Sequence, residues 1–96
     1  MSQTILHIEH TAIDYDKWKT AFDSDPIGRK KSGVRRYRVA RAEDDSNFVN
    51  IDLEFDSTDE AEQALAALRE VWKRVEGVAI TGARGRIFTV VEDEAP

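Results

Sequence analysis

Two histidines near the start of the chain are the first candidates for chemistry, because histidine is the side chain that most often performs general acid–base catalysis. His7 and His10 stand three positions apart in the alternating segment QTILHIEH of residues 3–10. Along a strand such positions point to opposite faces, so the two histidines cannot bind one metal ion together, and we predict no metal site. His10 ends the strand, where pockets tend to open, and is the candidate catalytic histidine. A hydrogen-bonded structural role is the alternative for both residues.

A basic stretch supplies the second group of candidates. Residues 29–41 hold seven of the fourteen Lys and Arg residues, a composition that suits an anionic ligand. Cations in a loop are most often solvated, and we expect this of Arg29, Lys30 and Lys31. The net charge of −5 argues against nucleic acid as a partner.

The amino-acid composition limits the classes of protein to which this chain can belong. The 96 residues, of which 41% are hydrophobic and 34% charged, predict a single domain over residues 1–96. The absence of cysteine excludes a disulfide framework, a thiol nucleophile and cysteine-bound zinc. No apolar stretch approaches the ~18 residues of a membrane span, and the first residues lack the pattern of a signal peptide. We expect a cytoplasmic protein with no membrane or nucleic-acid partner.

Residues 33–55 predict the β-hairpin that positions many of the polar side chains. Two runs of strand-forming residues flank an acidic loop at residues 44–46. A single antiparallel register sorts them into one apolar and one polar face, and a slip by one residue would place apolar residues opposite charges. The predicted pairs are Tyr37–Leu53 and Val39–Ile51 on the apolar face, with Arg36–Glu54, Arg38–Asp52 and Ala40–Asn50 on the polar face.

Two helices and two further strands complete the predicted elements. Asp14 suits the N-cap of a helix that ends near Ser24 and buries an aromatic stripe. A capping box at residues 57–60 opens a second helix, which ends before Gly77. Alternation predicts the first strand at residues 3–10. Residues 78–83 are a loop or a short extension, and residues 84–92 form the last strand.

This order of elements predicts an α+β fold: a ferredoxin-like βαββαβ sandwich with a four-stranded antiparallel sheet and two helices on one face. The other sheet face carries alternating acids, arginines and His7. One interpretation is a solvated face with cross-strand ion pairs, each worth ~0–1 kcal/mol. The alternative is a symmetric homodimer in which two such faces pack together.

The sequence also resembles a known superfamily. The order of elements and the runs DYDKWKTAFDSDP, GVRRYRVAR and DDSNFVNIDLEFDSTDEAEQAL are similar to those of ferredoxin-like dimeric α/β-barrel proteins, over roughly residues 3–92. Within it, the chain resembles small bacterial proteins described as cyclase-like or antibiotic-biosynthesis-monooxygenase-like. The resemblance implies a homodimer through the sheet face.

The resemblance to this superfamily also implies where a ligand would bind. In the oxygenases and cyclases of this superfamily the layer between helices and sheet opens into a pocket for a flat, aromatic or polyketide-like molecule. No cofactor is used, because the carbanion of the substrate activates oxygen while Asn, Trp, Tyr or Arg side chains steady an anion. Residues of these types, together with His10, give the candidate site: His10 and Arg41 as catalytic residues, with Tyr15, Trp18, Tyr37, Asn47 and Trp72 binding the substrate. Core packing is the alternative explanation for the aromatic residues.

Two functions follow from this site. The first is a dimeric small-molecule-binding protein that acts as a cofactor-free monooxygenase or cyclase. The second is a non-catalytic dimeric module that senses a ligand or assists another protein. A pocket of several hundred Å³ that reaches His10, Arg41 or Asn47 would favour the first, and a closed aromatic layer would favour the second.

Overall fold

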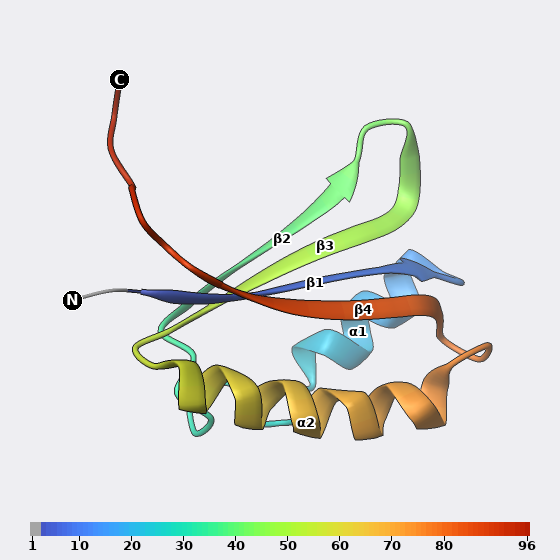
Figure 1. Cartoon of the computed structure of the whole chain (residues 1–96). Helices are drawn as coiled ribbons and strands as arrows, with labels where there is room; N and C mark the ends of the chain where they lie inside the picture. Colours follow the sequence, from blue (N-terminus) through green and yellow to red (C-terminus); the bar gives the residue numbers. More distant parts are fainter. Residues whose placement is uncertain (1–2) are drawn as a thin grey trace.

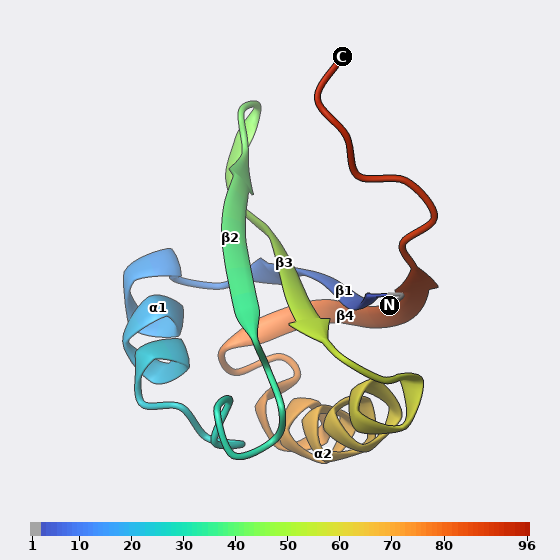
Figure 2. The same cartoon turned by 90° about the vertical axis from the view of Figure 1, so that its left-hand side faces the viewer.

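The computed structural model describes residues 3–96, in the order βαββαβ (Figure 1). The elements are β1 (Thr4–Ala12), α1 (Tyr15–Asp23), β2 (Arg36–Ala42), β3 (Asp45–Phe55), α2 (Thr58–Val75) and β4 (Ile80–Thr89). The four antiparallel strands are ordered β2-β3-β1-β4, and both helices cover the same face of the sheet (Figures 1 and 2). The fold is therefore ferredoxin-like, which confirms the predicted fold class.

The register of the β2–β3 hairpin is the one that the residue pattern predicts. Tyr37 lies opposite Leu53, and Arg38 lies opposite Asp52. The turn itself is shorter than predicted, because Ala42 lies opposite Asp45 and only residues 43 and 44 are left between the strands. The register shifts just before Ala42, and this irregularity absorbs the offset that a tight turn would otherwise impose on the whole hairpin.

Both helices begin with the caps that the sequence predicts. The Asp14 carboxylate accepts a hydrogen bond from the Lys17 backbone N–H at 3.2 Å. The Ser57 hydroxyl accepts one from the Glu60 N–H at 3.2 Å, and the Glu60 carboxylate in turn accepts from the Ser57 hydroxyl. These bonds satisfy backbone donors that have no partner within the helix, so each helix starts at a defined residue.

The first and last strands differ from their predicted bounds. β1 continues to Ala12, and β4 begins at Ile80 and ends at Thr89. Of the segment predicted as a loop or a short extension, residues 80–83 are therefore part of the last strand. The β1–β4 register shifts between Glu9 and Thr11, which places an extra β4 residue opposite His10. Gly82, at φ +67°, supplies the left-handed conformation that such a bulge requires.

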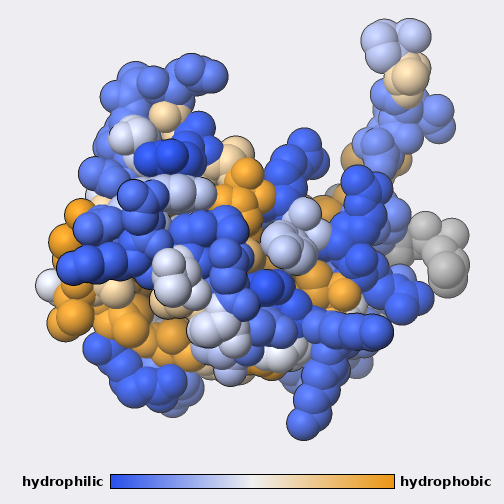
Figure 3. All heavy atoms as spheres, turned by 180° about the vertical axis from the view of Figure 1, so that it is seen from behind, coloured by the Kyte–Doolittle hydropathy of each residue, from blue (hydrophilic) through white to orange (hydrophobic). Residues whose placement is uncertain are grey.

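The core lies between the two helices and the central strands β1 and β3. Burying one such side chain contributes roughly 1.5–3 kcal/mol, so this layer dominates the stability of the fold. Hydrophobic atoms also reach the surface on the side seen in Figure 3. The buried apolar residues are Leu6, Ile8, Ala12, Trp18, Val49, Ile51, Leu53, Phe55, Ala61, Ala64, Leu65 and Ile80.

The opposite face of the sheet is polar and uncovered by any element of the chain. His7 and Asp52 form a hydrogen-bonded pair there, with 2.6 Å between Nδ1 and Oδ1. The predicted ion pairs of Arg36 and Arg38 with the acids opposite them do not form among residues 3–96, although the register is correct. Within residues 3–96, no helix is long and apolar enough to cross a membrane.

Candidate functional site

A cavity of ≈ 120 Å³ lies between α1, α2 and the sheet. Its walls are mostly aliphatic and aromatic side chains of both helices and of the two central strands. Polar side chains at its lining are His10 from β1 and the Asp25–Arg29 pair from the loop after α1. An apolar cavity with few, convergent polar groups is the usual form of a small-molecule site.

His10 is the most unusual polar group of this cavity. It is 2% exposed, and its Nδ1 atom is buried without a hydrogen-bond partner. Burial lowers the pKa of His10 to about 4, so the imidazole is neutral at pH 7. An unsatisfied buried nitrogen costs roughly 1–3 kcal/mol, so this group lowers the stability of the fold.

The position of His10 follows from the strand pattern. Thr4, Leu6, Ile8, His10 and Ala12 alternate with half-buried residues and form the helix-covered face of β1. His10 pairs with Val49 on β3, while the β4 bulge leaves it without a direct partner on the other side. The ring meets Trp18 of α1 edge to face, with 5.1 Å between the ring centroids.

A row of aromatic rings runs along α1 from this point. Trp18 stacks on Phe22 at 5.2 Å and lies 5.8 Å from Tyr15, and Phe22 meets Tyr37 of β2 edge to face at 5.5 Å. The row is the aromatic stripe predicted for this helix. The Arg41 guanidinium lies 3.7 Å from the centroid of the Tyr15 ring, so one end of the row carries a cation.

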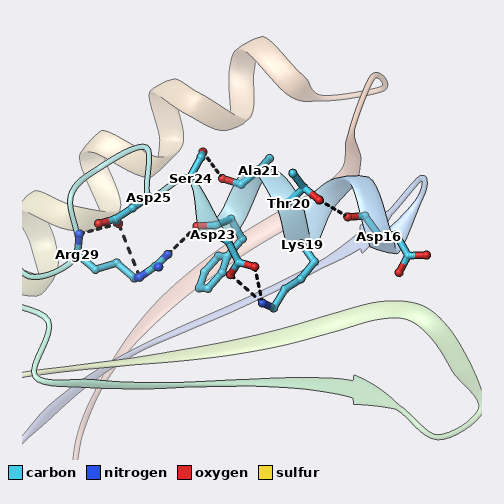
Figure 4. Close-up of polar contacts among 9 residues, drawn as sticks. Asp16, Lys19, Thr20, Ala21, Asp23, Ser24, Asp25 and Arg29 are labelled. Carbon is cyan, nitrogen blue, oxygen red and sulfur yellow. Dashed lines mark hydrogen bonds and ion pairs between the residues drawn. The ribbon is translucent and has the colours of Figure 1, made fainter.

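Arg29 occupies the other end of the row. Its guanidinium lies 4.2 Å from the centroid of Phe22 and 4.7 Å from that of Tyr37. It reaches back to α1, as Figure 4 shows, donates to the Phe22 carbonyl at 2.8 Å and lies 3.6 Å from the Asp25 carboxylate. Its side chain is only 16% exposed, so the expectation of a solvated Arg29 is wrong. A cation at the C-terminal end of a helix also interacts favourably with the helix dipole.

The loop that carries Arg29 is shaped by an unusual residue. Asp25 has φ +60°, the left-handed region that few residues other than glycine adopt. Its carboxylate accepts a hydrogen bond from the Arg29 backbone N–H at 2.8 Å. The two residues are thus fixed against one another, and both line the apolar cavity and an outer polar pocket of ≈ 750 Å³.

The structure brings together three of the seven candidate site residues at the cavity: His10, Trp18 and Trp72. Tyr15, Tyr37 and Arg41 belong to the aromatic row but do not line the cavity. Asn47 lies on β3 near the hairpin turn, where its backbone N–H donates to the Asp45 carboxylate. The catalytic and binding roles of all seven residues stay predictions.

Sequence reasoning missed Arg29 and Asp25 as parts of the site. The available signal was the dipeptide Asp25-Pro26 directly after a predicted helix, because aspartate tolerates the left-handed conformation and starts turns. No group of three or more metal-binding side chains occurs within residues 3–96.

The sequence matches no family model and no curated protein. Solved structures do match the fold. SnoaB, a cofactor-independent oxygenase from Streptomyces nogalater, superposes with a TM-score of 0.72 at 14% identity, over 96% of this chain and 95% of that one. A dimeric ferredoxin-like protein from an uncultured marine organism gives 0.68 at 14% identity, over 97% and 98%.

A putative antibiotic biosynthesis monooxygenase from Nitrosomonas europaea gives a TM-score of 0.57 at 15% identity, over 92% of this chain and 90% of that one. Identities this low establish the fold and leave activity open. The similarity extends over nearly the whole chain, so the ferredoxin-like fold seen in dimeric and monooxygenase-like proteins is also the fold of this chain.

Proposed function

We propose that this protein binds a small aromatic or polyketide-like molecule in the cavity between helices and sheet, and acts on it as a cofactor-free monooxygenase or cyclase. The single observation that supports this most is the buried, neutral imidazole of His10 in the lining of an apolar cavity. Similarity of fold to a cofactor-independent oxygenase is a second, weaker support.

The proposed reaction requires the protein only to bind the substrate and to provide one proton acceptor. In the oxygenase reaction, a hydroxylated ring loses its hydroxyl proton and becomes electron-rich enough to reduce dioxygen. One oxygen atom enters the ring as a carbonyl, the other leaves as water, and the substrate supplies the electrons. His10 would accept the hydroxyl hydrogen bond, and the developing anion beside it would raise its low proton affinity.

A homodimer through the open sheet face is part of the proposal. On this face the two central strands carry three acidic residues, and the two outer strands carry four arginines. The acids are Glu9, Asp52 and Glu54, and the arginines are Arg36, Arg38, Arg84 and Arg86. The buried Asn50 Oδ1 on this face has no partner within residues 3–96, so a second copy would supply a donor that the single chain lacks. A neighbour described as dimeric has the same fold.

Cytoplasmic location stays a prediction from the sequence.

The second candidate function is a non-catalytic ligand-binding module. The observation that favours it is the lowered pKa of His10, because a base this weak accepts a hydrogen bond readily and a full proton poorly. The cavity of ≈ 120 Å³ is also smaller than the several hundred Å³ expected of an enzyme pocket, and it does not reach Arg41 or Asn47.

Oxygen uptake separates the two functions. The purified protein, treated with a chelator and free of flavin, is mixed with a panel of hydroxylated aromatic compounds in an oxygen electrode. An enzyme consumes oxygen above the protein-free rate, forms the ring carbonyl product, and loses at least tenfold in rate when His10→Gln removes the acceptor. Binding without any oxygen uptake, across the panel, would eliminate the oxygenase. Recovery of the bound compounds unchanged would then eliminate the cyclase as well and leave the binding module.

A further inference from the structure

We infer that the cavity is built for a neutral, single-ring aromatic molecule with one hydroxyl group, a phenol, and excludes fused-ring compounds while Arg29 is in place. The inference rests on the proposed binding function and narrows its substrate class. The volume of the cavity, the unpartnered His10 imidazole in its lining and the position of Arg29 support it independently.

The volume sets the number of rings. In another protein, an apolar cavity of about 150 Å³ stays dry and binds benzene. The cavity here is ≈ 120 Å³, is lined by packed side chains, among them Ile8, Trp18, Leu68 and Trp72, and is partly open to the surface. Interiors are close-packed, so these side chains leave no room for a second fused ring deeper in the cavity.

The imidazole of His10 sets the functional group. The ring lines the cavity, and within residues 3–96 no side-chain hydrogen bond satisfies its nitrogens. A neutral imidazole has one donor and one acceptor nitrogen, and a hydroxyl both donates and accepts, so a hydroxyl can pair with whichever nitrogen it reaches. A methyl group can pair with neither.

The charges around the cavity favour a neutral molecule. The Arg29 guanidinium is already engaged by the Asp25 carboxylate and the Phe22 carbonyl. The rest of the lining has no charged side chain. A benzoate would lose its hydration without gaining a free cation, which is unfavourable in apolar surroundings.

Arg29 closes the way to a larger space. Its guanidinium is stacked against Phe22 and Tyr37, and the same side chain lines both the cavity and the outer polar pocket. We expect the two spaces to join when the side chain is removed. Arg29 is therefore a specificity-determining residue that sets the size of the bound molecule.

NMR titrations of the whole chain with phenol, toluene, benzoate and 2-naphthol test the inference. We expect phenol to bind about tenfold more tightly than toluene, the gain expected for one hydrogen bond to a buried group. Benzoate and 2-naphthol should leave the cavity residues unshifted. Equal affinity for phenol and toluene, binding of 2-naphthol to the unchanged chain, or no binding of phenol would each overturn the inference.

Two variants assign the effects to residues. His10→Leu should abolish the preference for phenol over toluene, whereas His7→Leu, the matched change on the other sheet face, should keep it. Arg29→Ala should admit 2-naphthol, with Arg35→Ala as a control arginine that lines only the outer pocket. If Arg29→Ala fails to fold, Arg29→Met keeps the aliphatic packing and removes the guanidinium stack, and it should admit 2-naphthol more weakly. Exclusion of 2-naphthol by a folded Arg29 variant would overturn the role of Arg29.

The outcome is distinguishable from failure of the proposed function. Phenol binding with the stated preferences but without oxygen uptake leaves this inference standing and eliminates the oxygenase. Oxygen-dependent turnover of 2-naphthol by the unchanged protein would support the oxygenase and overturn the size limit.

Discussion

The two faces of the sheet use the same residue type in opposite ways. His7 lies on the uncovered face, where its side chain is 30% exposed and its Nδ1 is 2.6 Å from the Asp52 carboxylate. His10, three residues later on the same strand, lies on the helix-covered face, 2% exposed and without a partner for Nδ1. On the uncovered face His7 is paired, and the buried Asn50 Oδ1 is left without a partner within residues 3–96. On the covered face the unpartnered group is His10, whose ring lines an apolar cavity, and this position beside a cavity marks the covered face as the candidate binding site.

The largest expected contrast between the faces is in packing. Leu6→Ala removes a side chain with no exposed surface and should lower the free energy of unfolding by about 2–5 kcal/mol. Ile5→Ala, one residue earlier and on the uncovered face, should cost about 1 kcal/mol. Urea unfolding of both variants measures the difference. Equal losses would mean that the two faces are not packed differently.

A glycine on the covered face gives the next contrast. A Cβ atom at Gly85 would lie 2.5 Å from Leu65 Cδ1 and 3.3 Å from the Trp72 ring. Gly85→Ala should therefore cost about 1–3 kcal/mol, the usual penalty for overpacking a core. The cost should shrink in a Leu65→Ala background, where the clashing methyl group is gone. An unchanged cost in both backgrounds, measured by thermal unfolding, would show that the clash is relieved in another way.

The acid dependence of stability tests the burial of His10. Its pKa falls from 6.5 when unfolded to about 4 when folded, so the unfolded chain takes up the proton first as the pH decreases. The stabilising contribution is complete above pH 6.5 and is lost as the pH falls toward 4, by about 2 kcal/mol at pH 5. The His10→Gln variant should lack this loss. Parallel pH curves for the two proteins would contradict a buried, neutral His10.

The smallest expected effect belongs to the uncovered face. The His7 and Asp52 side chains are 30% and 36% exposed, so water screens their interaction. A double-mutant cycle of His7→Gln and Asp52→Asn should give a coupling free energy of about 0–1 kcal/mol. A coupling of several kcal/mol that depends on protein concentration would mean that a second chain buries the pair, as in the proposed dimer.

The sequence predicts the framework because its signals are local and redundant. Alternation of apolar and charged residues fixes the hairpin register, since any slip would expose one whole face, and Asp14 and Ser57 mark where the helices begin. The exact turn was missed, because a bulge before Ala42 can compensate for a shorter turn without changing the strands around it.

The site is less predictable, because it depends on side chains that no short-range pattern links. The strand pattern places His10 on the covered face, but its lack of a partner depends on what the helices and the β4 bulge leave beside it. Arg29 looks like a solvated loop residue in the sequence. Its burial follows from the left-handed conformation of Asp25, which turns the loop back onto α1.

Nitrogen NMR of the histidine rings during a phenol titration tests the central claim most directly. We predict that the ring-nitrogen resonances of His10 shift in proportion to phenol occupancy at pH 7, while both ring nitrogens of His7 stay in place. Toluene at the same occupancy should shift the ring nitrogens of His10 much less. A titration in which phenol moves His7 alone, or leaves both histidines unchanged, would contradict a hydroxyl-binding site on the covered face.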